Sequence, residues 1–198
     1  MIWARRIGIV ILQLVASQID FEKLLGKSLT FIKIKFGSGY DISMELEKLK
    51  TACLAVVTDP ELIAHDITGD DVPETFCNRG FFKVASAMGC TSFRVDQSAN
   101  QMAKWIETHW QLVDGKEAQK CALAGKLVAA WAYGEKHGHI ATVFPGPLTP
   151  SGKWKKEVPL IAQVGKSKEM GGIGNGIMGA NYGFSTEPSY SVWENTNG

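Results

Sequence analysis

The spacing of the apolar residues changes near Gly125, and this change constrains the fold of the 198-residue chain more than any other feature. Before Gly125 the apolar residues recur mainly at helical spacing. After it they gather in short runs separated by glycine and proline turns, which is typical of strands. A group of helices followed by a group of strands indicates an α+β fold with an antiparallel sheet.

Helical and strand-like patterns can each be assigned to segments. The expected helices are Ser43–Val57, Cys77–Met88, Ala99–Trp110 and Glu117–Ala124. Thr75 is expected to act as the N-cap of the second helix, and Gly89 to end it. The expected strands after Gly125 are Lys126–Tyr133, His139–Phe144, Pro159–Val164 and Ser189–Trp193. An earlier alternating segment, Leu29–Phe36, predicts a further strand.

An acidic stretch, Asp59–Glu74, separates the first part of the chain from the rest. It contains two prolines and a glycine, so it predicts a loop or linker. We therefore expect residues 1–69 to form an N-terminal extension of helix, strand and helix. This extension would pack on a core formed by residues 70–198.

The charges are balanced, since 21 lysines and arginines and 20 aspartates and glutamates leave a net charge of +1. This balance offers no electrostatic reason to expect a nucleic acid partner. No apolar run is long enough to predict an integral membrane segment. Arg5 and Arg6, followed by an apolar stretch up to Ala16, have the outline of a secretory signal. The alternative is a first amphipathic helix packed on the domain.

Cys77 is the strongest candidate for a nucleophile among the four cysteines. It stands at the expected start of a helix, where unpaired N–H groups lower a thiol pKa from about 8.5 and can bind an oxyanion. The alternative is a buried structural cysteine. Cys53, Cys90 and Cys121 have apolar neighbours within or after helices, so structural roles are expected for them. No C-x-x-C pair occurs, which argues against a zinc ribbon.

His139 is the candidate base for this thiol. It opens an expected strand, and such a position holds the ring rigidly at the end of a sheet. His137 would share a face with His139, and Glu135 would extend that face, so a metal site is the alternative. No fourth ligand is near and Gly138 interrupts the strand, so we expect no metal.

Gln163 is the only polar residue in the third expected strand after Gly125. A polar side chain in a buried strand costs free energy unless it is hydrogen-bonded, so Gln163 is the candidate to orient the His139 ring. The alternative is that Gln163 faces solvent on an edge strand. Asn175 and Asn181 are reserve candidates for the same role.

Two further segments carry motifs without a matching context. Gly174–Gly179 spells G-x-G-x-x-G but has no βαβ unit around it. We therefore expect the glycine-rich stretch Gly171–Gly183 to be a flexible loop beside the site rather than a dinucleotide site. Trp154 stands among three lysines and predicts an exposed hairpin tip.

The order of these features resembles the NlpC and CHAP group of papain-like cysteine peptidases and amidases. The segments that carry the resemblance are Thr75–Asn78, Ala99–Met102, Gly138–Val143 and Pro159–Gly165, and it extends over residues 70–193. The resemblance implies a papain-like NlpC/CHAP-type α+β fold, with N-terminal helices packed on a small antiparallel sheet. Many members of the group have a second histidine as the third catalytic residue, where this chain has Gln163.

The resemblance also implies roles for individual residues. Cys77 would be the nucleophile, His139 the general base and Gln163 the residue that orients the histidine. The backbone N–H groups of Cys77 and Asn78 would bind the oxyanion. The implied activity is that of a cysteine hydrolase, which cleaves amide bonds of peptidoglycan peptides through a thioester, with no metal or organic cofactor.

The implied place of action is the periplasm or cell envelope. Peptidoglycan peptides would be the substrate, and an inhibitor or immunity protein is a further expected type of partner. Two alternatives stay open. One is an enzyme of the same fold that acts on another amide or acyl substrate, as a toxin or transferase; the other is a catalytically silent cell-wall-binding domain.

Overall fold

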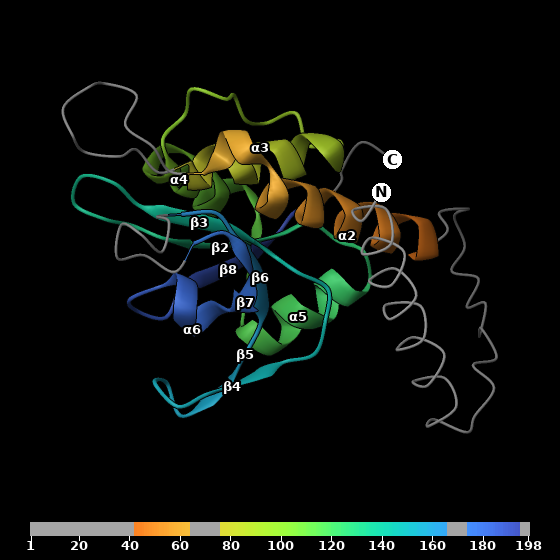
Figure 1. Cartoon of the computed structure of the whole chain (residues 1–198), viewed down its shortest axis with the longest axis vertical. Helices are drawn as coiled ribbons and strands as arrows, with labels where there is room; N and C mark the ends of the chain where they lie inside the picture. The colour runs from red at the N-terminus through yellow and green to blue at the C-terminus, as the bar shows by residue number, and fades with distance from the viewer. Residues whose placement is uncertain (1–41, 64–75, 166–173, 195–198) are drawn as a thin grey trace, which may run out of the picture. The chain divides into compact units, whose positions relative to one another are not determined.

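The computed structural model describes residues 42–63, 76–165 and 174–194, which all belong to one compact unit, Tyr40–Gly198 (Figure 1). The helices are α2 (Ile42–Thr58), the 3₁₀ helix η1 (Pro60–Leu62), α3 (Cys77–Ala87), α4 (Ala99–His109), α5 (Gly115–Leu123) and α6 (Ala180–Gly183). The strands are β1 (Gln111–Val113), β2 (Val128–Ala132), β3 (His139–Val143), β4 (Thr149–Ser151), β5 (Lys156–Val158), β6 (Leu160–Gln163), β7 (Gly176–Gly179) and β8 (Ser189–Val192).

The four helices expected from Ser43 onward and the four strands expected after Gly125 are all present, with bounds within two residues of the expected ones. Six strands form one sheet in the order β1-β8-β2-β3-β6-β7, and β4 pairs with β5 in a separate ribbon. All of these pairs are antiparallel. The structure therefore confirms an α+β fold with an antiparallel sheet. The expected strand Leu29–Phe36 lies outside the described residues.

Two local expectations are wrong. Part of the glycine-rich stretch is not a loop, because β7 pairs with β6 from Gly176 opposite Gln163 to Gly179 opposite Leu160. Glycine weakens a strand on its own, and here the backbone ladder with β6 outweighs that tendency. Trp154 lies in the turn of the expected hairpin, formed by β4 and β5, but it is half-buried and packs against the core rather than being exposed.

The starts of α3 and α4 differ in how their first N–H groups are satisfied. Ser98 caps α4 and forms a capping box with Gln101, whose side chain accepts the Ser98 N–H. The N-cap of α3 is Phe76, which makes no side-chain cap hydrogen bond. The expected N-cap, Thr75, lies outside the described residues. Among the described residues, the N-cap residue itself therefore provides no capping side chain to the first turn of α3.

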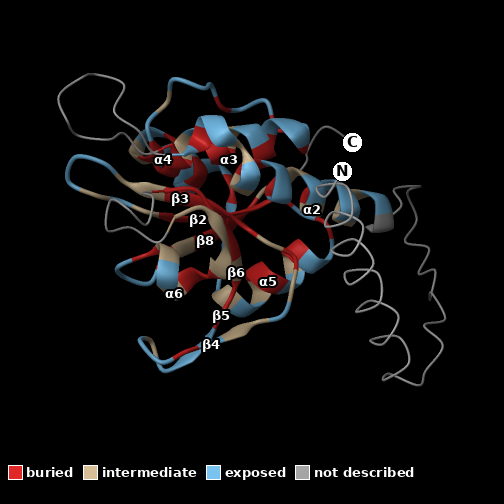
Figure 2. Ribbon diagram, in the orientation of Figure 1, coloured by how far each residue is buried: buried red, intermediate tan, exposed pale blue. Residues whose placement is uncertain are grey.

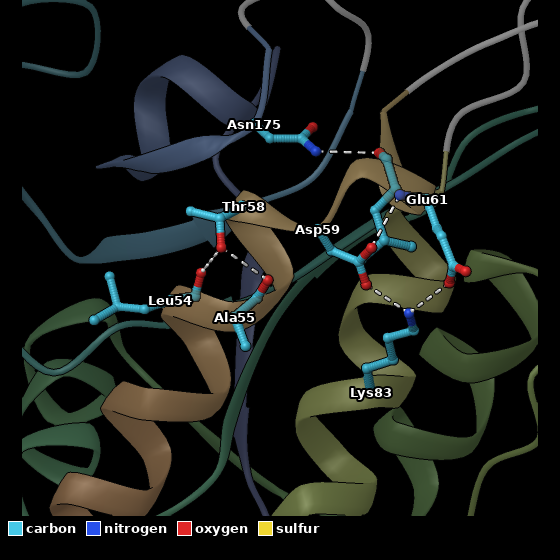
Figure 3. Close-up of polar contacts among 8 residues, drawn as sticks. Leu54, Ala55, Thr58, Asp59, Glu61, Lys83 and Asn175 are labelled. Atoms are coloured by element: carbon cyan, nitrogen blue, oxygen red, sulfur yellow. Dashed lines mark hydrogen bonds and ion pairs between the residues drawn. The ribbon is translucent and has the colours of Figure 1, made fainter. Parts of the chain in front are cut away.

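Helix α2 packs on α3, and η1 comes directly after α2 in the chain (Figure 3). Asp59 accepts a hydrogen bond from the Glu61 N–H at 2.9 Å, and Lys83 of α3 reaches Asp59 at 2.6 Å and Glu61 at 3.3 Å. An exposed ion pair of this kind contributes at most about 1 kcal/mol. The larger contribution comes from Leu49 and Cys53, which are fully buried. Helix α2 belongs to the same compact unit as α3, and the expected boundary at residues 69/70 lies outside the described residues.

The core lies on both faces of the sheet. Figure 1 shows α3 and α4 on one side of the sheet and α5 on the other, and Figure 2 shows their buried faces turned toward it. Phe81, Phe93 and Trp110 form an aromatic cluster with ring centroids 5.5–6.1 Å apart. None of the helices in the described ranges is long and apolar enough to cross a membrane.

Candidate active site

Cys77 is the first residue of α3 and its side chain is nearly buried, with 5% exposed. Its thiol is hydrogen-bonded to the His139 ring, and the backbone N–H groups of Asn78 and Ile140 also point at the sulfur. The thiol therefore lies between the start of α3 and the start of β3.

His139 and Gln163 come from neighbouring strands, and the sheet register brings them together. Val143 of β3 lies opposite Ile161 of β6. Alternate residues face the same side of a sheet, so His139 shares a face with Val143, and Gln163 shares that face with Ile161. The His139 Nε2 atom lies 2.8 Å from the Gln163 Oε1 atom. Gln163 is only 6% exposed, so it does not face solvent on an edge.

The two hydrogen bonds of the Gln163 amide indicate which ring nitrogen of His139 carries a hydrogen. Its Nε2 atom donates to the Val164 carbonyl at 3.3 Å, so Oε1 is the end that accepts from His139. The His139 Nε2 atom therefore carries a hydrogen, and Nδ1 is the nitrogen directed to Cys77. This order of contacts, thiol to imidazole to amide, connects the three candidate residues in one line.

The pKa values of the pair shift in opposite directions. Burial by itself raises the pKa of the Cys77 thiol, but the hydrogen bond and charge of His139 and the two backbone N–H groups outweigh it, so this pKa lies below its ordinary value. Burial by itself lowers the pKa of His139, but the hydrogen bond and charge of Cys77 and the hydrogen bond to Gln163 outweigh it, so this pKa is raised. The thiolate and the imidazolium thus stabilise each other. Such a pair can supply both a nucleophile and a proton donor.

Asn78 contributes through its backbone more than through its side chain. Its N–H is hydrogen-bonded to the Cys77 sulfur and helps to lower the pKa of that thiol. Its side-chain Nδ2 atom donates to the Gln97 carbonyl at 2.7 Å, which attaches the start of α3 to the loop before α4.

Neither reserve asparagine is hydrogen-bonded to His139 among the described residues. Asn175 accepts a hydrogen bond from the Gly165 N–H at 3.0 Å and donates one to the Leu62 carbonyl at 3.1 Å (Figure 3). The Asn181 Oδ1 atom is buried and has no hydrogen-bond partner among the described residues. Within these residues, the amide that reaches His139 is that of Gln163.

The other cysteines and histidines take no part in the contacts that connect Cys77, His139 and Gln163 among the described residues. Burial raises the pKa of Cys53 to about 12, and burial is also the main cause of the raised pKa of Cys90 and Cys121. All four cysteines are free thiols. His109 stacks on Trp105 with ring centroids 3.5 Å apart. The remaining histidines are His137, which is exposed between β2 and β3, and His65, which lies outside the described residues.

Among the described residues, no group of three His, Cys, Asp or Glu side chains is arranged to hold a metal ion. Two further residues make contacts near the site that the sequence analysis did not predict. Phe184 packs its ring against His139 in a T-shaped arrangement, with centroids 4.7 Å apart. Asn100 holds Gly134, at the start of the β2–β3 connection, through two hydrogen bonds of 2.9 and 3.2 Å. No local pattern marks Phe184, whereas Asn100 lies in one of the segments that carry the resemblance.

Comparison of the chain with protein-family models and with curated protein sequences gives no match.

Proposed function

We propose that the chain is a cysteine hydrolase of amide bonds with a papain-like NlpC/CHAP-type fold, and that its substrates are peptidoglycan peptides. One observation carries the catalytic part of the proposal: the continuous contacts from the Cys77 thiol through His139 to Gln163, with opposite pKa shifts in the first two. The resemblance of the segments around these residues to the NlpC and CHAP group supports the fold and the substrate class. The proposed place of action is the periplasm or cell envelope, where this substrate lies.

The first half of the reaction forms a thioester. The Cys77 thiolate attacks the carbonyl carbon of the amide, and the electron pair of the C=O bond moves to the oxygen. The N–H groups of Cys77 and Asn78 bind this oxyanion. When the electrons return and the C–N bond breaks, the His139 imidazolium gives its Nδ1 proton to the leaving amine.

The second half regenerates the thiol pair. Neutral His139 accepts a proton from a water molecule as that water adds to the thioester carbonyl. The C–S bond then breaks, the carboxylic acid product leaves, and the thiolate is again paired with the imidazolium. Gln163 keeps the ring in the same orientation through both halves, because its bond is to Nε2 and the chemistry is at Nδ1.

The decisive experiment is mass analysis of muropeptides after incubation of purified peptidoglycan with the full chain. We expect new peptide fragments with the wild type and none with Cys77→Ala, while Cys121→Ala, which removes a free thiol with a raised pKa, should remain active. Unchanged muropeptides would contradict the substrate class. Hydrolysis of a different amide or acyl compound would then favour the enzyme alternative, and binding without turnover would favour a silent domain.

A further inference from the structure

The amide group of Gln163 lies between two glycines. A Cβ atom added at Gly165 would lie 2.5 Å from the Gln163 Nε2 atom. A Cβ atom added at Gly183 would lie 2.6 Å from the Gln163 Oε1 atom and 2.6 Å from Cδ1 of Ile161. Real Cβ atoms essentially never come within 3.0 Å of another heavy atom in this way. With a side chain at either position, the amide would have to shift from the place that it occupies here.

The backbone does not explain these glycines. The described glycines with a positive φ are Gly89, Gly125 and Gly174, and neither Gly165 nor Gly183 is among them. An alanine could adopt the backbone conformation at either place. What a new Cβ would meet is the side chain of Gln163 and, at Gly183, also that of Ile161.

The atom that Gly183 accommodates is the one that matters for the histidine. Gln163 Oε1 accepts the hydrogen bond from His139 Nε2 at 2.8 Å. The other end of the amide is held by the Val164 carbonyl and lies against Gly165, so the amide has no free space in that direction. A side chain at residue 183 would therefore have to displace Oε1 from the histidine.

We propose that Gly183 is a positioning residue, whose missing side chain lets Gln163 hold the His139 ring in its reactive orientation. Phe184, the next residue, packs against the same ring, so this short segment positions both the amide and the imidazole. The inference rests on the proposed function, because the orientation of His139 affects turnover only if His139 takes part in a reaction.

The Gly183→Ala variant tests the proposal. The two atoms that a new Cβ would meet are the ends of flexible side chains, so we expect the variant to fold with a nearly unchanged melting temperature. We expect kcat to fall by about tenfold or more with little change in KM, because small misplacements of catalytic groups carry costs of this size. The matched control is Gly152→Ala, whose Cβ would meet no atom within 4 Å and which should behave as wild type.

Two measurements distinguish positioning from general damage. The pKa of His139, followed by NMR, should fall in Gly183→Ala, because the hydrogen bond to Gln163 is one of the interactions that raise it. Gly165→Ala, which crowds the other end of the amide, should lower it as well. In the Gln163→Ala background, Gly183→Ala should cost no further activity, because the amide oxygen is no longer there.

The outcomes separate the two proposals. A His139 pKa that is the same in Gly183→Ala and wild type would overturn the positioning role of Gly183, and so would an equal loss of kcat in the presence and absence of the Gln163 amide. The NMR measurement needs no substrate. Absence of hydrolysis by the wild type, together with the expected fall in the His139 pKa, would therefore overturn the proposed function and leave the positioning inference standing.

Discussion

At the scale of single residues, the surroundings of a thiol decide its chemistry. Cys53 and Cys77 are both almost entirely inaccessible to solvent, with 0% and 5% exposed. Burial raises the pKa of Cys53 to about 12, and no charged group in the described part of the chain offsets it. The same effect at Cys77 is outweighed by His139 and by two N–H groups. The histidine and the helix start, rather than exposure, distinguish the candidate nucleophile.

The pH dependence of alkylation tests the pairing of Cys77 with His139. The thiolate exists above the lowered pKa of Cys77 and the imidazolium below the raised pKa of His139, so hydrolysis should be fastest between the two values. In His139→Ala, the remaining influences on the pKa of Cys77 are its burial and the two backbone N–H groups. We expect the pKa of Cys77 to rise and its alkylation by iodoacetamide at pH 7 to slow by about tenfold or more. Mass analysis of the Cys77 peptide across a pH series measures the inflection.

The control for this series is His137→Ala, because His137 is exposed in the turn before β3. It should leave the alkylation profile of Cys77 unchanged. An inflection that stays the same in His139→Ala would show that the helix start alone stabilises the thiolate. Equal changes of the alkylation profile in His137→Ala and His139→Ala would indicate that the two histidines share a role.

Gln163→Ala should reduce turnover while leaving the reactivity of the thiol nearly unchanged. Gln163 contacts the ring nitrogen that does not face Cys77, so its loss frees the ring without removing the charge next to the sulfur. We expect kcat to fall by one to two orders of magnitude, or about 1.4–2.7 kcal/mol of barrier. Steady-state kinetics and alkylation at neutral pH measure the two effects separately. A fully active Gln163→Ala beside an inactive Asn181→Ala would transfer the orienting role to Asn181.

At the scale of elements, α5 holds the segment where β3 ends and β6 begins. The Gln119 side chain donates to the Phe144 carbonyl at 2.8 Å and accepts from the Leu160 N–H at 3.0 Å, and it is 2% exposed. One buried amide thus satisfies a backbone acceptor and a backbone donor on two strands. Helix α5 thereby supports the pair of strands that carries His139 and Gln163.

Gln119→Ala should destabilise the fold by about 1–3 kcal/mol, because it removes the partner of two partly buried backbone groups. Denaturant unfolding followed by circular dichroism measures the change. Lys116→Ala, an exposed substitution on the same helix, should change the free energy of unfolding by less than about 0.5 kcal/mol. A loss in Gln119→Ala no larger than that of the control would mean that water replaces the amide at both groups.

Sequence patterns predicted the elements better than the contacts between them. Helix α4 was predictable because Ala99, Met102 and Ile106 belong to an apolar stripe at helical spacing, and all three are buried in the structure. Gln163 was predictable as a partner of His139 because a lone polar residue in a buried strand needs a hydrogen bond. Strand β7 was not predictable, because its glycines have a low tendency to form a strand and the backbone hydrogen bonds with β6 stabilise it. Gly183 could not be singled out either, because its role depends on space left beside a side chain 20 positions away.

At the scale of the whole molecule, the candidate site exists only in the complete fold. Its residues come from the start of a helix, the start of one strand and the end of another. The low pKa of Cys77 should therefore disappear on unfolding, whereas the high pKa of Cys53 should fall to that of a free thiol. Both cysteines respond to folding, and they respond in opposite directions.

Alkylation rates of Cys77 and Cys53, measured in increasing denaturant, should show these opposite changes. At neutral pH the native chain should be modified at Cys77 and protected at Cys53. In full denaturant the two rates should become equal, at a value set by a free thiol pKa of about 8.5. Mass analysis of both peptides and far-UV circular dichroism should give the same midpoint. Loss of Cys77 reactivity well before the global transition would contradict this prediction, because it would show that the site melts separately.

The position of β8 has a consequence for biosynthesis. It is the last described strand along the chain, yet it lies between β1 and β2 in the sheet. A ribosome must therefore deliver residue 192 before β1 can be joined to the sheet, since β1 pairs only with β8 within the described residues. Until then the nascent chain presents the apolar edge of β2, Val128–Ala132, to other molecules, and unpaired edges of this kind invite aggregation. Chaperones that shield exposed strands during translation should thus influence the yield of this protein more than its final stability.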